Sequence, residues 1–372
     1  MEYRHGGDVY RNRQVELDFS ININPLGMPE AVRQEALAGV LESARYPDSR
    51  CGRLKTLTAD YYQVPEDCLI FGNGAAELIF GIARAAAAKK AVLLAPSFTE
   101  YEAALKCTGT DCRFFYLKEK EGFRLPVEEY LEFLEKEAPQ LIFLCNPSNP
   151  VGTVTEREDM KKILDFCGDR GIFAVVDECF LDFLENGKAL SVADEAANGN
   201  EGLFVLRAMT KIFAMAGLRL GYGFLGNRKL KESMESSIQP WNVSIPAQYA
   251  GCAAFGDWRN HYLSATRELL KSQREYLGRG LLDAGFSLFD SRANFLFFKD
   301  SERREERALY RYFLEQKILI RCCDDFRGLN GRFYRICLKR QEDNERFLGT
   351  LQGYLNKKTN LLLQKPFKAD IL

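Results

Sequence analysis

The chain has 372 residues, of which 46% are hydrophobic, and because single cores stop growing near about 250 to 300 residues we expect two domains. Its 51 Lys and Arg residues and 52 Asp and Glu residues give a formal net charge of −1, which excludes an overall basic field for nucleic acid or anionic membranes. Any anion that the protein binds must therefore be held by local charges.

The N-terminal stretch MEYRHGGDVYRNRQ lacks the apolar core of a signal peptide, and no later run approaches the roughly 18 apolar residues that span a bilayer. We therefore expect a soluble, cytoplasmic protein. The 11 cysteines are an odd number without CxxC spacing, and most lie in apolar runs such as LIFLC. We expect buried thiols in a reducing compartment, with no disulfide framework and no metal site.

In chain order, the middle of the sequence alternates short apolar runs with amphipathic stretches. The runs are AVLLA (91–95), LIFLC (141–145), IFAVVD (172–177), LFVL (203–206) and YGFLG (222–226), and a helical pattern covers 155–168. This alternation predicts βαβ units and a mostly parallel sheet that is covered on both faces. The functional site of such a sheet lies at the C-terminal ends of its strands.

The pattern changes in the last third of the chain. A long charged helix is predicted over 257–284, followed by strand-like runs at 292–298, 318–322 and 332–338 and by helices over 302–316 and 341–355. We expect a large domain over 41–250 and a smaller α+β domain over 251–355. An N-terminal arm over 1–40 is expected to pack with the small domain, and a tail of unknown role covers 356–372.

The stretch LIFGNGAAELIF (69–80) contains a candidate phosphate site. Its glycines directly precede a helix that is predicted to begin near Ala75. The free N–H groups of a helix N-terminus attract anions, so the backbone at Ala75 and Ala76 is a plausible phosphate cradle. A glycine-rich stretch before a helix is more often a simple turn, so this stretch alone does not identify a phosphate site.

A second stretch, TKIFAMAGLRLGY (210–222), has two cations among apolar and small residues, Lys211 and Arg219. An unpaired buried cation costs several kcal/mol, so each cation needs a partner if the segment is buried. One interpretation is a surface helix edge with two long side chains reaching water. The other is an amine nucleophile beside a guanidinium that binds an anion.

Several residues occur in an order that resembles a known family. They are Tyr46 in RYPD, Phe98 in PSFTEY, Asn149 in NPSNPVG, Asp177 in VVDE, and Thr210, Lys211 and Arg219 in TKIFAMAGLRLGY. Over nearly the whole chain this set resembles the aspartate-aminotransferase-type enzymes, the fold type I family that uses pyridoxal 5'-phosphate. The resemblance implies an α/β fold with a large, mostly parallel sheet domain and a smaller C-terminal domain.

The resemblance also implies roles. Lys211 would be the amine that carries the cofactor aldehyde, Asp177 the carboxylate that keeps the ring nitrogen protonated, Phe98 a ring stacked on the cofactor, and Asn149 a hydrogen-bond partner of the ring oxygen. The cofactor phosphate would be held by Arg219, Thr210 and the N–H groups of Ala75 and Ala76. The residue that matches Tyr46 reaches this phosphate from the other subunit in relatives, which implies a homodimer with a shared active site.

One position departs from the family pattern. Many aminotransferases of the group carry a tyrosine in a DEAY motif, whereas this chain has Phe180 in DECF. The change removes a hydroxyl donor to the ring oxygen, so Asn149 is expected to hold that oxygen largely alone. A tolerated packing exchange is the alternative explanation.

Further stretches narrow the resemblance: HGGD (5–8), LDFSININPLGMP (17–29), PWNVS (240–244), SRANFLFF (291–298) and ILIRCCDDFRGLNGRFYRI (318–336). They resemble threonine-phosphate decarboxylases of cobalamin biosynthesis more than histidinol-phosphate aminotransferases, which remain the alternative. The substrates of both groups are phosphorylated, and the matching substrate residues here are His5, Asn22, Arg321 and Arg335. The implied reaction is decarboxylation of L-threonine O-phosphate to aminopropanol phosphate. We expect the protein to bind neither nucleic acid nor a membrane.

Overall fold

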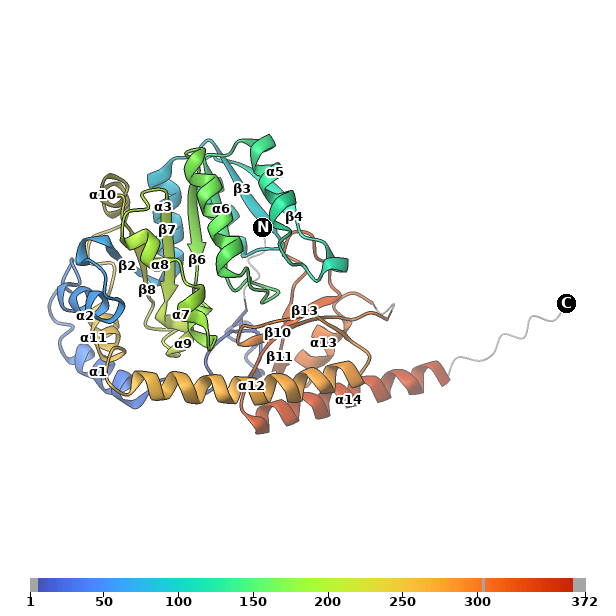
Figure 1. The fold of residues 1–372 in the computed structure, drawn as a ribbon. Helices are drawn as coiled ribbons and strands as arrows, with labels where there is room; N and C mark the ends of the chain where they lie inside the picture. Colours follow the sequence, from blue (N-terminus) through green and yellow to red (C-terminus); the bar gives the residue numbers. More distant parts are fainter. Residues whose placement is uncertain (1–5, 303–304, 364–372) are drawn as a thin grey trace.

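The computed structural model describes residues 6–302 and 305–363 of the chain. Its centre is a seven-stranded sheet with helices on both faces, and a smaller four-stranded sheet lies beside it (Figure 1). His5 lies outside the described residues, as does the part of the expected tail from residue 364 onward. None of the helices in the described part is long and apolar enough to cross a membrane.

The large sheet has the strand order β2-β8-β7-β6-β5-β3-β4. All neighbours pair in parallel except β8, which is antiparallel to both β7 and β2, so the predicted mostly parallel sheet is confirmed. The strands are β2 (Leu69–Asn73), β3 (Lys90–Ala95), β4 (Asp111–Tyr116), β5 (Leu141–Cys145), β6 (Phe173–Asp177), β7 (Leu203–Ala208) and β8 (Leu220–Leu225).

Helices that lie on the large sheet present one apolar side to it, as α6 illustrates. On α6 the buried residues Met160, Ile163, Leu164 and Cys167 recur at helical spacing, and the outer side is charged. The helices are α1 (Glu30–Leu41), α2 (Gly52–Tyr62), α3 (Gly74–Ala86), α4 (Thr99–Cys107), α5 (Val127–Glu137), α6 (Arg157–Asp169), α7 (Gly187–Leu190), α8 (Ala193–Ala197), α9 (Met209–Ile212), α10 (Arg228–Ser237) and α11 (Ile245–Ala253), with 3₁₀ turns η1 (Glu66–Cys68), η2 (Glu119–Glu121) and η3 (Leu181–Phe183).

The smaller sheet is antiparallel and has the order β12-β13-β10-β9. The long helices α12 and α14 lie side by side along its outer edge (Figure 1). Helix α14 continues to Leu363, so it extends into the region expected to be a tail. The elements are α12 (Arg259–Asp283), β9 (Ser287–Leu288), β10 (Phe295–Lys299), α13 (Ala308–Glu315), β12 (Arg321–Cys322), β13 (Phe333–Cys337) and α14 (Gln341–Leu363).

The N-terminal segment connects the two sheets. Strand β1 (Leu17–Asp18) pairs in parallel with β11 (Ile318–Leu319), and the N–H of Cys337 donates to the carbonyl of Phe19 at 2.8 Å. Helix α1 instead packs against α11 of the large domain. The domain limits drawn from the sequence stay predictions. All 11 cysteines lie in the described part of the chain and are free thiols there.

Candidate active site

A cavity of about 410 Å³ lies where strands β5, β6 and β7 end, because their last residues, Cys145, Asp177 and Ala208, all line it. The position agrees with the rule that sites of parallel sheets form at the C-terminal strand ends. The cavity collects most of the residues singled out from the sequence: Asn22, Ala75, Ala76, Phe98, Asn149, Asp177, Thr210, Lys211, Arg219 and Arg335.

Lys211 lies on the short helix α9, directly after the central strand β7. Its ammonium has no ion-pair or hydrogen-bond partner among the described residues. Burial lowers the pKa of Lys211, and the nearby cations Arg335 and Arg219 act in the same direction. The backbone is fixed, since the N–H of Asn24 donates to the Lys211 carbonyl at 3.1 Å. The arrangement favours a neutral, nucleophilic amine.

Asp177 is buried at the end of β6, and both of its carboxylate oxygens are engaged. The Cys179 N–H donates to Oδ1 at 2.9 Å, and the Tyr101 hydroxyl donates to Oδ2 at 2.6 Å. A carboxylate with two donors is stabilised in its charged form. It can therefore act as the partner of a positively charged group in the cavity.

The start of α3 forms a cradle of donors at one end of the cavity. Gly74 has φ +76°, and a Cβ there would lie 2.5 Å from Arg219 Nη2, so the glycine lets the guanidinium reach the helix N-terminus. Gly221 on β8 is equally required, since a Cβ there would lie 2.4 Å from the Ala75 nitrogen. Free helix N–H groups beside a guanidinium suit a phosphate group.

Arg335 and Asn149 form the opposite side of the cavity. Both side chains are buried, and Arg335 Nη1 donates to Asn149 Oδ1, which leaves the Asn149 amide as a donor. Arg335 Nη2 donates to the Ser20 carbonyl at 2.9 Å, while its Nε and the Asn22 Oδ1 atom are buried without a partner. Burial lowers the pKa of Arg335 to about 10, so the guanidinium is still charged at neutral pH. No carboxylate among the described residues pairs with it, which suits an incoming anion.

Two other predicted residues lie elsewhere. Arg321 stands opposite Arg335 in the β12–β13 pair, but it is bound to Asp325 at 2.6 Å and does not line the cavity. Tyr46 is 76% exposed and lies outside the cavity, where its ring contacts that of Trp241 in a tilted arrangement with centroids 4.6 Å apart. The roles assigned to all of these side chains stay predictions.

Sequence reasoning missed Tyr101 and the thiols Cys145 and Cys179, which line the cavity around Asp177. A signal for Tyr101 was present, because it follows Phe98 by three residues at the start of a helix and therefore shares its side. Phe180, the departure from the family motif, also lines the cavity and packs edge-on against Phe295 at 5.4 Å.

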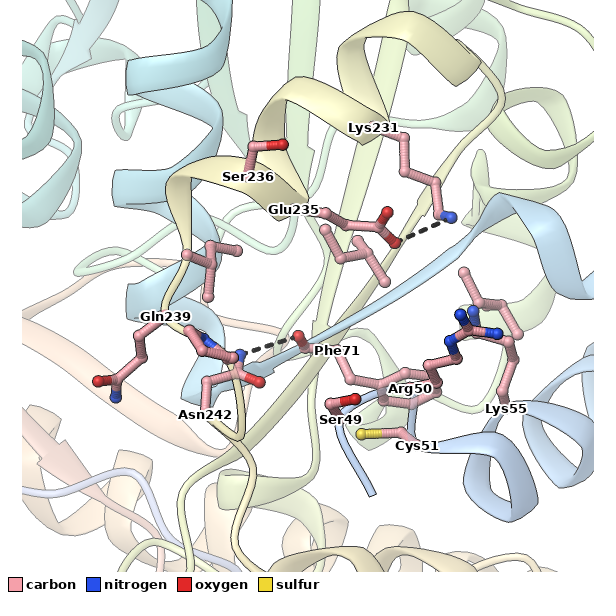
Figure 2. A pocket seen from close by; sticks show the side chains of 14 residues that line it. Ser49, Arg50, Cys51, Lys55, Phe71, Lys231, Glu235, Ser236, Gln239 and Asn242 are labelled. Carbon is pink, nitrogen blue, oxygen red and sulfur yellow. Dashed lines mark hydrogen bonds and ion pairs between the residues drawn. The ribbon is translucent and has the colours of Figure 1, made fainter. Parts of the chain in front are cut away.

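A larger cavity of about 630 Å³ lies next to the edge strand β2 and contains none of the predicted site residues. Figure 2 shows Arg50, Lys55 and Lys231 along its wall, with Lys231 paired to Glu235 at 3.0 Å. It has neither a buried unpaired cation nor a buried carboxylate of the kind found around Asp177. The chemistry is therefore assigned to the smaller cavity.

The residues of the smaller cavity fit pyridoxal phosphate. The donor cradle at Gly74 suits its phosphate, the unpaired Lys211 amine suits its aldehyde, and the oriented Asp177 carboxylate suits a protonated ring nitrogen. The aromatic side chain of Phe98 lines the same cavity, as a stacking partner of the ring must.

Comparisons with known proteins agree with this reading of the site. A family model described as aminotransferase class I and II matches residues 15–351. A protein of Caldanaerobacter subterraneus named as a threonine-phosphate decarboxylase is 38% identical over 94% of each chain, and the threonine-phosphate decarboxylase of Salmonella typhimurium is 34% identical over 94% of this chain and 96% of its own.

Among solved structures, the histidinol-phosphate aminotransferase from Clostridium acetobutylicum superposes with a TM-score of 0.84 at 30% identity, covering 92% of this chain and 99% of the other. The predicted aspartate-aminotransferase-like architecture is thereby confirmed. The match to the family model extends over most of the chain, including all ten predicted residues that line the cavity. The chain belongs to the aminotransferase class I and II family.

Proposed function

We propose that the protein is a pyridoxal-phosphate-dependent threonine-phosphate decarboxylase. It converts L-threonine O-phosphate to aminopropanol phosphate and carbon dioxide, a reaction of cobalamin biosynthesis. The observation that carries the proposal is the buried Arg335, which faces the same cavity as Lys211 and Asp177 and has no carboxylate partner among the described residues. Relatives named for this reaction are similar to the chain over almost its whole length.

Some residues of the cavity would bind the cofactor, and others would bind the substrate. Bound pyridoxal phosphate supplies a ring that withdraws electrons from a substrate carbon. Lys211 Nζ would hold the cofactor aldehyde and release it to the substrate amine, and Asp177 would hold a proton at the ring nitrogen. Arg219, Thr210 and the first N–H groups of α3 would hold the cofactor phosphate, so that the substrate phosphate needs separate cations.

Arg335 supplies one of those cations. A planar guanidinium with a free Nε matches a phosphate or carboxylate in two-point geometry, and Asn22 lies buried in the same cavity. A decarboxylase must fix the substrate carboxylate so that its bond to the substrate carbon can break, and a proton must then return to that carbon. Lys211 Nζ, which lines the cavity, would supply this proton.

The active site is completed by a second copy of the chain. Tyr46 and Trp241 are 76% and 47% exposed, although large aromatic side chains are usually buried, and their rings contact each other in a tilted arrangement outside the cavity of their own chain. We assign Tyr46 to the cofactor phosphate of the partner subunit. The sequence neighbours of Trp241, Pro240 and Asn242, line the larger cavity. We therefore place the subunit boundary on this side of the molecule.

The decisive experiment is incubation of the purified enzyme and pyridoxal phosphate with L-threonine O-phosphate and no oxo-acid. We expect many molecules of carbon dioxide per enzyme and an equal amount of aminopropanol phosphate, with Lys211→Ala as the inactive control. Unphosphorylated threonine should be a far poorer substrate. If no carbon dioxide appears while histidinol phosphate and an oxo-acid react rapidly, the protein is an aminotransferase.

The cofactor assignment has a separate test. Borohydride reduction of the loaded enzyme should attach the cofactor irreversibly to the peptide that contains Lys211. A label on another peptide would show that the wrong lysine has been assigned.

A further inference from the structure

Tyr101 has a fixed relation to the Asp177 carboxylate. It lies fully buried on α4, and its hydroxyl donates to Asp177 Oδ2 at 2.6 Å. Because the Cys179 N–H occupies Oδ1 at 2.9 Å, the two donors together define the plane of the carboxylate. The cofactor assignment requires one carboxylate oxygen to point at the ring nitrogen, so this plane matters for function.

The Tyr101 ring cannot swing away from this position. It stacks on Phe143 of β5, with centroids 5.0 Å apart and an interplanar angle of 19°. Phe98 packs against it edge-on at 5.5 Å, and the Tyr101 N–H donates to the Phe98 carbonyl at 3.3 Å. The residue expected to cover the cofactor and the residue that holds Asp177 therefore belong to one packed unit.

The Tyr101 hydroxyl also keeps its proton. Burial raises the pKa of Tyr101 well above its ordinary value, and the neighbouring Asp177 charge raises it further. The phenol is thus a permanent donor toward the carboxylate. A donor of this kind favours the charged form of a buried carboxylate, which burial alone would disfavour.

We propose that Tyr101 is a positioning residue whose hydroxyl holds Asp177 as an oriented carboxylate, so that the proton between Asp177 and the cofactor remains on the ring nitrogen. No atom is transferred to or from Tyr101. The inference rests on the proposed use of pyridoxal phosphate in this cavity, but it holds for decarboxylation and transamination alike.

The test compares Tyr101→Phe with Tyr130→Phe. Both tyrosines are fully buried, but among the described residues the Tyr130 hydroxyl has no hydrogen-bond partner, so its removal controls for loss of a buried hydroxyl alone. Tyr101→Phe preserves the ring and its stacking. We expect it to weaken cofactor binding to the apo-protein by about tenfold, since the lost hydrogen bond involves a charged group. Tyr130→Phe should change this affinity less than about twofold.

The absorption spectrum gives a readout that packing does not affect. If the cofactor ring carries less positive charge, the nitrogen that joins Lys211 to the cofactor should hold its proton more tightly. The visible absorption changes when this nitrogen loses its proton, so the midpoint of the absorption change should move up by about one pH unit in Tyr101→Phe. The kcat should fall about tenfold with KM nearly unchanged, because substrate contacts remain intact. Tyr130→Phe should match the parent enzyme in both measurements.

A double-mutant cycle with Asp177→Asn completes the test. If Tyr101 acts through the carboxylate, Tyr101→Phe should change cofactor affinity less than about twofold in the Asp177→Asn background. Equal effects of Tyr101→Phe in both backgrounds, or a spectrum identical to that of Tyr130→Phe, would overturn the positioning role. Failure of the parent enzyme to bind pyridoxal phosphate at Lys211 would instead refute the proposed function.

Discussion

At the scale of single residues, the cavity holds Lys211 and Arg335 without an acidic partner among the described residues. Each carries an electrostatic cost in the empty protein, because a buried charge is not compensated. The proposed roles explain the cost, since a nucleophilic Lys211 needs a low pKa and an anion-binding Arg335 must lack an acidic partner. This cost can be measured as the difference in the free energy of unfolding between the parent protein and a variant that lacks the charge.

Replacing Lys211 by Met should stabilise the cofactor-free protein at neutral pH. The folded protein has a lowered pKa at Lys211 and the unfolded chain has the ordinary value of 10.5, so the charged amine disfavours folding at every pH below the folded pKa. We expect a gain of about 1 kcal/mol, seen as a higher Tm. The gain should shrink as pH rises through the folded pKa toward 10.5. A gain that is constant with pH would point to packing as its cause.

Arg335→Ala should reduce the enzyme's preference for phosphorylated over unphosphorylated threonine. If Arg335 binds the substrate phosphate, its loss costs about 2 to 5 kcal/mol for threonine phosphate and little for threonine. The measurement is kcat/KM for both substrates, with Arg346→Ala, an exposed arginine paired to Glu16, as control. Equal slowing of both substrates would assign Arg335 to the carboxylate.

At the scale of elements, the loop from β2 to α3 shows how backbone conformation builds the phosphate cradle. Gly74 combines a positive φ with close approach of Arg219, whereas Gly109 has a similar φ of +73° and open space around it. A substitution at Gly109 would strain the backbone alone, whereas the same substitution at Gly74 would strain the backbone and also displace Arg219. Comparing the two variants therefore distinguishes the two effects.

Gly74→Ala and Gly109→Ala should each destabilise the protein by roughly 1 kcal/mol, because Ala is strained at positive φ. Only Gly74→Ala should also weaken cofactor binding, since the new methyl group displaces the Arg219 guanidinium. Thermal unfolding measures the first effect and cofactor titration of the apo-protein the second. Equal cofactor affinities in the two variants would argue against the cradle.

Elements with a strong local signal were predicted well from the sequence. The five apolar runs of the middle region are all strands, since a strand inside a sheet that is covered on both faces is apolar on both faces. Strand β4 was not predicted because it lies at the sheet edge, and its partly exposed sequence DCRFFY has no continuous apolar run. The helix expected over 302–316 is shorter, Ala308–Glu315.

The site was predicted where chemistry demands a particular residue type and missed where geometry decides. Lys211 and Asp177 were assigned through the family resemblance, and they do line one cavity. The bond from Tyr101 to Asp177 joins residues 76 positions apart, and no local pattern reports such a contact. Arg321 and Asp325 are neighbours at i and i+4, but they lie in a strand and a turn instead of a helix, so helical spacing did not predict their ion pair.

At the scale of the whole molecule, a shared active site can be tested by mixing inactive variants. Lys211→Ala and Tyr46→Ala chains should each have little activity as homodimers. After dissociation and reassociation, a mixed dimer has one site with an intact Lys211 from one chain and an intact Tyr46 from the other. Random pairing should restore about a quarter of the parent activity. No recovery from verified mixed dimers would place Tyr46 outside the partner's site.

The N-terminal segment has a consequence for handling the protein. Residues 17–24 contact both domains: Ser20 accepts a hydrogen bond from Arg335, and Asn24 binds the backbone at Lys211 and Ile212. Gly6 lines the catalytic cavity itself. A purification tag fused at the N-terminus would therefore be attached only a few residues before this cavity-lining glycine, whereas the far end of α14 projects away from both sheets (Figure 1). Kinetic constants from N-terminally tagged protein should be compared with those of protein from which the tag has been cleaved.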